Sequence, residues 1–218
     1  MKFYPMNINI ENKKCVVIGG GKIAFDKVVG LLEAGANVEV IAPKICTELE
    51  NLRDKIKIVR ENYSAEKISE GVILIAATNN SELNAQIAKD ARAKHFLVNI
   101  VDNISSDFIV PSRIRRGDFL IAISTGGTSP AFSKFVRKML EQELDENFGA
   151  AVEIISKYRQ AVIKKIPTHE LRIQFWQEIL TAEIWENIKS GNLSTLENKL
   201  QEFFGRDKNA LKNIGAEL

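Results

Sequence analysis

The feature that most constrains the fold of this chain is a glycine-rich turn between a short apolar strand and an amphipathic helix. The turn reads Gly19-x-Gly21-x-x-Ala24. Gly19 permits the tight turn, Gly21 lets the backbone approach phosphates, and Ala24 lets helix and strand pack closely. The helix N-terminus adds free N–H groups and the positive end of the helix dipole. The pattern predicts a site for the pyrophosphate of a nicotinamide or flavin dinucleotide, and hence a redox role.

The segments around this turn support the same interpretation. The helix places Ala24, Val28, Leu31 and Leu32 on one face and ends at Gly35, and a second strand over residues 38–41 follows at the expected distance. Glycine turns are common, so the alternative is a tight turn of an α/β sheet that binds nothing.

The first half of the chain continues to alternate strands and helices. A short helix is expected before residue 54, and strands are expected at 56–59, 72–76 and 96–100. A helix that follows a cap at residues 78–81 connects the last two. Alternation of this kind, with continuous apolar strands, predicts a Rossmann-like parallel sheet with helices on both faces.

After Asp102 the pattern changes. Segments 108–110 and 119–123 are predicted to be antiparallel strands joined by a basic turn at 113–118, because a parallel crossover needs a longer connection. A helix capped by Ser129 then runs to about Leu144, and its apolar residues are expected to point inward: Phe132, Phe135, Val136, Met139 and Leu140.

From residue 148 onward the sequence predicts only helices. Breaks are expected at 167–168, 190–191 and 205, and Ser194 with Glu197 forms a capping-box pattern. The expected organisation is a dinucleotide-binding domain at 1–112, a strand–strand–helix dimerisation segment at 113–147 and an all-helical domain at 148–218.

Composition excludes several classes of function. The net charge of +2 gives no general case for nucleic-acid binding, and no apolar run approaches the length of a membrane span. The two cysteines, Cys15 and Cys46, and the two histidines, His95 and His169, lack metal-ligand spacing. We therefore expect a cytoplasmic protein with no resident metal site.

Ligands of open α/β sheets bind at the carboxyl ends of the strands. The second strand ordinarily ends in an acidic residue that binds the ribose hydroxyls, but here Ala42, Pro43 and Lys44 follow it. By itself this departure leaves the choice between NAD and NADP open. Asp102 follows the strand at 96–100, where a carboxylate can take a proton from a substrate as hydride leaves, or can simply cap a turn.

The stretch from Ser124 to Pro130 combines glycines and hydroxyls before a helix N-terminus. Such a stretch can bind an anion or can be an ordinary capped loop. Positive charge gathers nearby, either as solvated surface or as a rim for a substrate with several carboxylates: Arg113, Arg115, Arg116, Lys134, Arg137 and Lys138.

These segments together resemble the precorrin-2 dehydrogenase family, which includes the N-terminal half of multifunctional sirohaem synthase. The match covers roughly residues 1–180, and it rests on Val17–Ala24, Leu32–Ala36, Ile75–Asn79, Asn99–Asp102, Phe108–Ser112 and Ser124–Pro130. The resemblance implies oxidation of precorrin-2 to sirohydrochlorin with NAD as cofactor. Some members also insert Fe²⁺ as a substrate to give sirohaem.

The resemblance also implies roles for individual residues. Asp102 matches the family's catalytic base, and the cofactor is expected to contact Gly19, Gly21, Lys22, Ile23, Pro43, Lys44, Thr78 and Asn79. The tetrapyrrole is expected to bind between the nucleotide domain and the dimer arm of a homodimer, at Arg113, Ser124, Thr125, Gly126, Gly127, Thr128, Ser129 and Arg137. The alternatives are a non-enzymatic NAD-sensing regulatory module and a different NAD(P)-dependent dehydrogenase.

Overall fold

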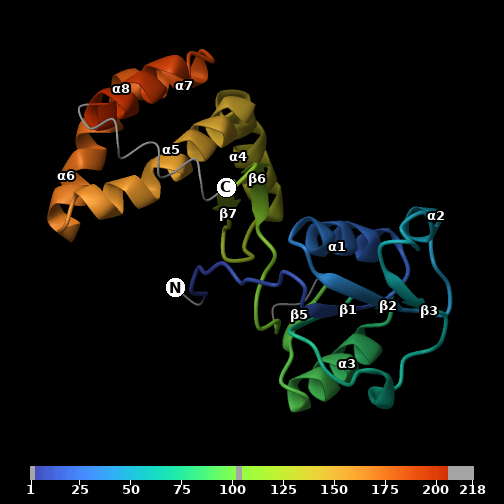
Figure 1. The fold of residues 1–218 in the computed structure, drawn as a ribbon. Coiled ribbons are helices and arrows are strands. Elements are labelled where there is room, and N and C mark those ends of the chain that lie inside the picture. Colours follow the sequence, from blue (N-terminus) through green and yellow to red (C-terminus); the bar gives the residue numbers. More distant parts are fainter. Residues whose placement is uncertain (1–2, 102–104, 206–218) are drawn as a thin grey trace. The chain divides into compact units, whose positions relative to one another are not determined.

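A computed structural model describes residues 3–101 and 105–205 (Figure 1). Their contacts divide the chain into two compact units, with the boundary between Val110 and Pro111. Each unit is considered by itself.

The first unit is built on a five-stranded parallel sheet of order β3-β2-β1-β4-β5. Its strands are β1 (Lys14–Ile18), β2 (Asn37–Ile41), β3 (Lys57–Val59), β4 (Ile73–Ala76) and β5 (Leu97–Ile100). Its helices are α1 (Lys22–Glu33), α2 (Thr47–Glu50), the 3₁₀ turn η1 (Ala65–Lys67) and α3 (Ser81–Ala93). Helices α1 and α3 cover opposite faces of the sheet (Figure 1), which confirms the predicted Rossmann-like fold.

The two faces of the sheet are buried in two separate apolar clusters because side chains alternate along each strand. In β1, Cys15 and Val17 pack in one cluster with residues of α1, and Val16 and Ile18 pack in the other with residues of α3. All four are at most 2% exposed. A strand covered on both faces has to be apolar throughout, and this explains the continuous apolar runs.

One charged residue, Glu39, is buried in β2. Its carboxylate lies 2.7 Å from Lys14 Nζ and 3.1 Å from Lys57 Nζ, on the two neighbouring strands. Burial by itself raises the pKa of Glu39, but the hydrogen bonds and charges of the two lysines outweigh this, so the pKa lies below its ordinary value. Glu39 therefore ties three strands together as a charged group.

The second unit begins with an antiparallel hairpin of β6 (Ser112–Arg116) and β7 (Phe119–Ile123). The prediction of a strand at 108–110 with a basic turn at 113–118 is wrong, because the arginine-rich segment is itself the strand. Ile114 points inward and is 1% exposed, and Gly117, with φ +55°, allows a two-residue turn. The Gly-Asp pair at 117–118 was the available signal for this turn.

Helix α4 (Pro130–Glu143) follows the hairpin, with the predicted cap from Ser129, whose Oγ accepts a hydrogen bond from the Phe132 N–H. The expectation that its apolar face points inward is wrong for its largest side chains. Phe132, Phe135 and Met139 are 57%, 56% and 44% exposed, whereas Ser133 is buried. Apolar periodicity identified the helix but not which of its faces is buried.

The described part of the second unit continues with four further helices: α5 (Glu146–Lys165), α6 (His169–Ile179), α7 (Ala182–Lys189) and α8 (Ser194–Gly205). Thr181 caps α7, a break between helices that the sequence interpretation missed. The capping box at Ser194 does not form, since the Glu197 N–H donates to Leu193 O and the Ser194 hydroxyl to Asn192. A shared core that includes Phe148, Phe175 and Phe204 holds the helices together.

Candidate functional site

A cavity of about 650 Å³ lies at the carboxyl ends of four strands of the first unit. The loops after β1, β2, β3 and β4 all contribute to its wall, as expected at the point where the strand order reverses. The residues that line it are Ile18, Gly19, Gly20, Gly21, Ile41, Ala42, Pro43, Lys44, Ile45, Cys46, Asn62, Tyr63, Ala77, Thr78, Asn79 and Leu83.

The glycine turn packs closely against the two neighbouring loops. A Cβ on Gly19, which has φ +133°, would lie 2.2 Å from the Ala77 carbonyl oxygen, and one on Gly20 would lie 1.9 Å from that of Lys44. The Cys46 N–H donates to Gly20 O at 2.7 Å, which fixes the loop after β2 against the turn. Glycine at these two positions is therefore a requirement of the fold.

Gly21 is different, because a Cβ there would meet nothing within 4 Å. It is the N-cap of α1, and among the described residues no side chain caps the N–H groups of that first turn. Open space in front of uncapped N–H groups is the environment that a pyrophosphate needs. Among the cavity residues just named there is no carboxylate to repel it. The residues present thus fit a dinucleotide.

Six of the expected cofactor residues line the cavity: Gly19, Gly21, Pro43, Lys44, Thr78 and Asn79. The other two, Lys22 and Ile23, are exposed in the first turn of α1 and do not line it. They lie one and two positions after Gly21, so a ligand at the helix N-terminus would approach them by way of their backbone.

A buried asparagine that the sequence interpretation missed holds the loop after β4. Asn84, 4% exposed in α3, accepts hydrogen bonds from the Thr78 hydroxyl at 2.7 Å and from the Thr78 N–H at 3.1 Å. Its amide donates to Thr78 O at 3.0 Å. Thr78 is therefore fixed at the cavity edge by a residue whose only sequence signal is a polar side chain on the apolar face of a predicted helix.

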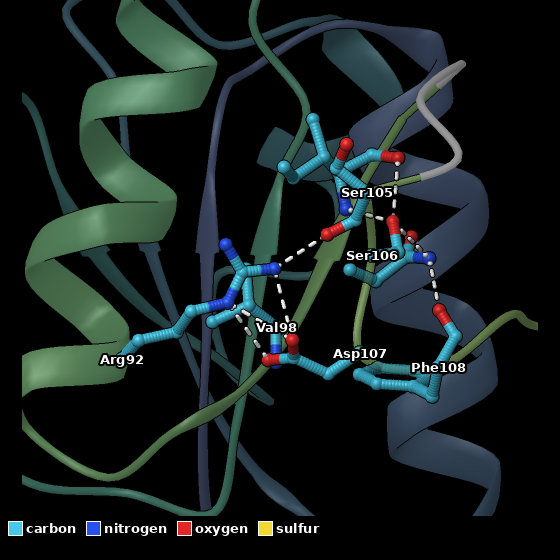
Figure 2. A network of polar contacts seen from close by, with 8 residues as sticks. Arg92, Val98, Ser105, Ser106, Asp107 and Phe108 are labelled. Atoms are coloured by element: carbon cyan, nitrogen blue, oxygen red, sulfur yellow. Dashed lines mark hydrogen bonds and ion pairs between the residues drawn. The ribbon is translucent and has the colours of Figure 1, made fainter.

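The predicted catalytic residue, Asp102, lies outside the described residues, but the structure shows what holds the chain on either side of it (Figure 2). Ser106 Oγ accepts a hydrogen bond from the Ile100 N–H at 2.8 Å and donates to Ile100 O at 3.1 Å. These two bonds join the end of β5 to the segment that returns after Asp102. The buried side chain of Asn99 also donates to Phe108 O, at 2.9 Å.

A second pair of contacts extends this network to α3 (Figure 2). Asp107 Oδ2 accepts from the Val98 N–H at 2.9 Å, and the Asp107 N–H donates to Val98 O at 2.8 Å. Arg92 forms an ion pair with Asp107 at 2.9 Å and donates to Ser105 O at 2.5 Å. The backbone of β5, an edge strand of the sheet, is thus paired by the side chains of Ser106 and Asp107 and by the Asp107 N–H, without a further strand beside it.

The expected substrate loop, Ser124–Ser129, belongs to the second unit and is held by its own hydroxyls. Ser124 Oγ accepts from the Gly126 N–H at 3.0 Å, and Thr125 Oγ1 accepts from the Ser129 N–H at 2.9 Å. Gly126 and Gly127 both have left-handed backbone, with φ +65° and +86°. The loop has a defined shape that depends on these glycines. Thr128 is exposed on it.

The basic residues near this loop are mostly engaged within the unit. Arg137 pairs with Glu141 one helical turn further along α4. Arg116 donates to Leu144 O at 3.1 Å and lies 3.2 Å from a Glu146 carboxylate oxygen. Arg113 lies half-buried in β6. These contacts show that part of the predicted rim stabilises the hairpin and the end of α4.

Two expectations concern the whole of the described chain. Residues 3–101 and 105–205 contain no group of three or more His, Cys, Asp or Glu side chains placed to hold a metal ion. Within the same residues, none of the helices combines the length and the apolar composition needed to cross a membrane.

Comparison with known proteins identifies three consecutive segments. Residues 6–112 match a family model described as "Putative NAD(P)-binding", residues 116–143 match "Sirohaem biosynthesis protein central", and residues 147–204 match "Sirohaem synthase dimerisation region". The first match lies within residues 1–112, the segment that the sequence analysis assigns to dinucleotide binding. The dimerisation model matches the helical part, C-terminal to the segment for which dimerisation was predicted.

Curated relatives carry the name siroheme synthase. The chain is 35% identical over 204 residues to that of Nitrosococcus oceani and 33% identical over 210 residues to that of Zymomonas mobilis. These alignments cover 92% and 95% of the chain but only 44% and 45% of the relatives, so the chain spans less than half of their length.

A solved structure, "SirC, precorrin-2 dehydrogenase", shares the fold, with a TM-score of 0.73 at 21% identity over 92% of this chain and 100% of that one. Fold, family models and relatives agree with the resemblance read from the sequence. The chain belongs to the sirohaem synthase family and matches its NAD(P)-binding, central and dimerisation regions.

Proposed function

We propose that the protein oxidises precorrin-2 to sirohydrochlorin with NAD in the biosynthesis of sirohaem. The observation that carries this proposal is the cavity at the four strand ends, whose glycine turn leaves room and uncapped N–H groups for a pyrophosphate. The names of the relatives and of the structure with the same fold supply the substrate class. The alternative of a regulatory NAD-sensing module has no support from the family models.

The reaction removes a hydride and a proton from the tetrapyrrole. NAD, when bound, accepts the hydride. The backbone of the Gly19–Gly21 turn and the start of α1 bind the pyrophosphate, and Thr78 and Asn79 lie at the cavity wall after β4, the strand next to β5. Asp102, which follows β5 by two residues, takes the proton as general base.

The second unit supplies groups for the carboxylates of the substrate. Loop Ser124–Ser129 precedes the N-terminus of α4, where backbone N–H groups and the helix dipole favour anions. Arg113 and Arg137 are the basic residues proposed to act with it. The internal hydrogen bonds of the loop support this role, because a preformed anion site loses little entropy when the ligand binds.

The deciding experiment supplies precorrin-2 and NAD to the full chain and follows the absorbance change that accompanies formation of sirohydrochlorin. Turnover with NAD is expected, and the same assay is repeated with NADP in place of NAD. No turnover with either cofactor would overturn the proposal. Fe²⁺ added to the product in the presence and absence of the protein measures the insertion that the resemblance implies for some members.

Asp102→Asn tests the assignment of the base. The variant is expected to bind NAD like the wild-type chain but to lose turnover by about 100-fold or more, since a positioned general base contributes that much. Isothermal titration with NAD and the absorbance assay separate the two effects. A variant that keeps most of its rate would show that Asp102 caps a turn and that the base lies elsewhere.

We also propose that the chain forms a homodimer through the exposed face of α4. Phe132, Phe135, Val136 and Met139 recur at helical spacing, and the rings of Phe132 and Phe135 lie 6.2 Å apart. A second copy of the same face, related by a two-fold axis, would cover this stripe. The match of the adjoining helices to a dimerisation region supports this partner.

A further inference from the structure

The cavity extends beyond the glycine turn to the end of β3, where Asn62 and Tyr63 line it. We propose that the ring of Tyr63 stacks on the adenine of the bound dinucleotide and that Leu83 forms the adjoining apolar wall. This inference rests on the proposed NAD site. Neither residue is among those that the sequence predicted for cofactor binding.

The topology of the sheet places the adenosine half of the ligand at this end. In dinucleotide folds the pyrophosphate lies on the turn after the first strand, and the adenosine ribose lies at the end of the second. Here β2 and then β3 lie on that side of β1, in the order β3-β2-β1. The base that continues beyond the ribose therefore meets the loop after β3, which carries Tyr63.

The ring of Tyr63 is held in place from behind. Its hydroxyl donates to Asp90 Oδ2 in α3 at 3.0 Å, and Gln86 Nε2 donates to Asp90 Oδ1 at 2.8 Å. Tyr63 also packs, half-buried, against the same apolar cluster as Val59 and Leu83. Burial and the neighbouring Asp90 raise the pKa of the Tyr63 hydroxyl far above its ordinary value, so it remains a donor.

The lining of the cavity favours a neutral aromatic ligand at this position. Tyr63 is the single aromatic residue among the described residues that line it, and none of them carries a carboxylate. Adenine is flat and uncharged, so it can stack on an aromatic face without a carboxylate nearby. A ring braced by α3 provides such a face with little loss of entropy on binding.

The test compares three ligands by isothermal titration on the full chain: NAD, ADP-ribose and nicotinamide mononucleotide, which lacks the adenosine half. Tyr63→Leu is expected to bind NAD and ADP-ribose about tenfold more weakly, because stacking on a base contributes about that much. Binding of nicotinamide mononucleotide is expected to stay the same. Tyr63→Phe, which keeps the ring and loses the bond to Asp90, is expected to stay within about threefold of wild type.

Tyr4→Leu is the matched control, since Tyr4 is 82% exposed and does not line the cavity. Thermal unfolding checks that each variant is folded. If Tyr63→Leu does not fold, Tyr63→Met, which has a longer and more flexible apolar side chain, takes its place. Wild-type affinity for NAD and ADP-ribose in the folded variant would overturn the proposal. So would an equal loss for all three ligands, which indicates a purely structural role. A wild-type chain that binds no NAD would overturn the proposed function as well.

Discussion

The two units of this protein bury their apolar surface to different degrees. In the first unit both faces of the sheet are covered, and the residues of β1 and β4, apart from Lys14 at the start of β1, are at most 5% exposed. In the second unit α4 leaves two phenylalanines and a methionine more than 40% exposed. The first unit therefore has a complete core and a formed cavity within one chain. The second unit has an apolar surface that a further chain is proposed to cover.

Glycine substitutions offer the sharpest test of how closely the first unit is packed. Gly20→Ala would place a methyl carbon 1.9 Å from a backbone oxygen, so we expect a loss of about 3 kcal/mol or more in the free energy of unfolding. Gly21→Ala, where nothing lies within 4 Å, is expected to leave stability unchanged but to weaken NAD binding by about tenfold or more. Chemical denaturation and titration with NAD measure both. Equal stability of the two variants would contradict the described packing of the turn.

Among the described residues of the second unit, Gly149 is the glycine packed most closely against its neighbours. A Cβ on Gly149 in α5 would lie 2.6 Å from Arg116 O in β6, so Gly149→Ala is expected to cost about 2 kcal/mol of stability by separating the helix from the hairpin. Gly205→Ala, at the end of α8 with nothing within 4 Å, is the control and is expected to change little. If denaturation curves show no difference between them, the packing of α5 on β6 is looser than described.

The exposed face of α4 is tested by charge. Phe135→Glu is expected to raise the dissociation constant of the proposed dimer at least tenfold, about 1.4 kcal/mol, because a buried unpaired carboxylate opposes association. The stability of the monomer should change little, since Phe135 is 56% exposed. Light scattering over a dilution series measures the effect. Lys134→Glu, on a neighbouring part of the helix surface, is the control, and an equal response of both variants would count against the stripe as the interface.

The smallest effect is expected at Glu39. Glu39→Gln removes an ion pair with two partly exposed lysines, so about 1 kcal/mol of stability should be lost at neutral pH. Because the pKa of Glu39 is lower in the folded than in the unfolded chain, its contribution is present above the unfolded-state pKa, about 4, and is lost as the pH falls through the folded value. Urea titrations at pH 7 and near pH 3 should show the difference between wild type and variant shrinking. Glu48→Gln, on the exposed side of α2, is the control.

Local sequence patterns were sufficient where one short segment carries both the signal and the structure. The glycine turn, the apolar strands of the first sheet and the Ser129 cap of α4 were all predicted where they occur. The hairpin was misplaced, because a run of arginines suggested an exposed turn. In the structure this run forms a strand, and its Ile114 is buried in the core. Asn84 and Ser106 were missed, because each bonds a residue six positions away, Thr78 and Ile100, that only the fold of the intervening chain brings close.

The sequence by itself determined the strands of the parallel sheet, the position of the glycine turn and the family, since each is recognised from residues adjacent in the chain. Only the tertiary structure decided which strand ends share one cavity, that Tyr63 from β3's loop lines it beside the turn after β4, and which face of α4 is left exposed. The physical reason is that apolar spacing defines a stripe along a helix or strand. What covers that stripe depends on contacts between segments distant in the chain.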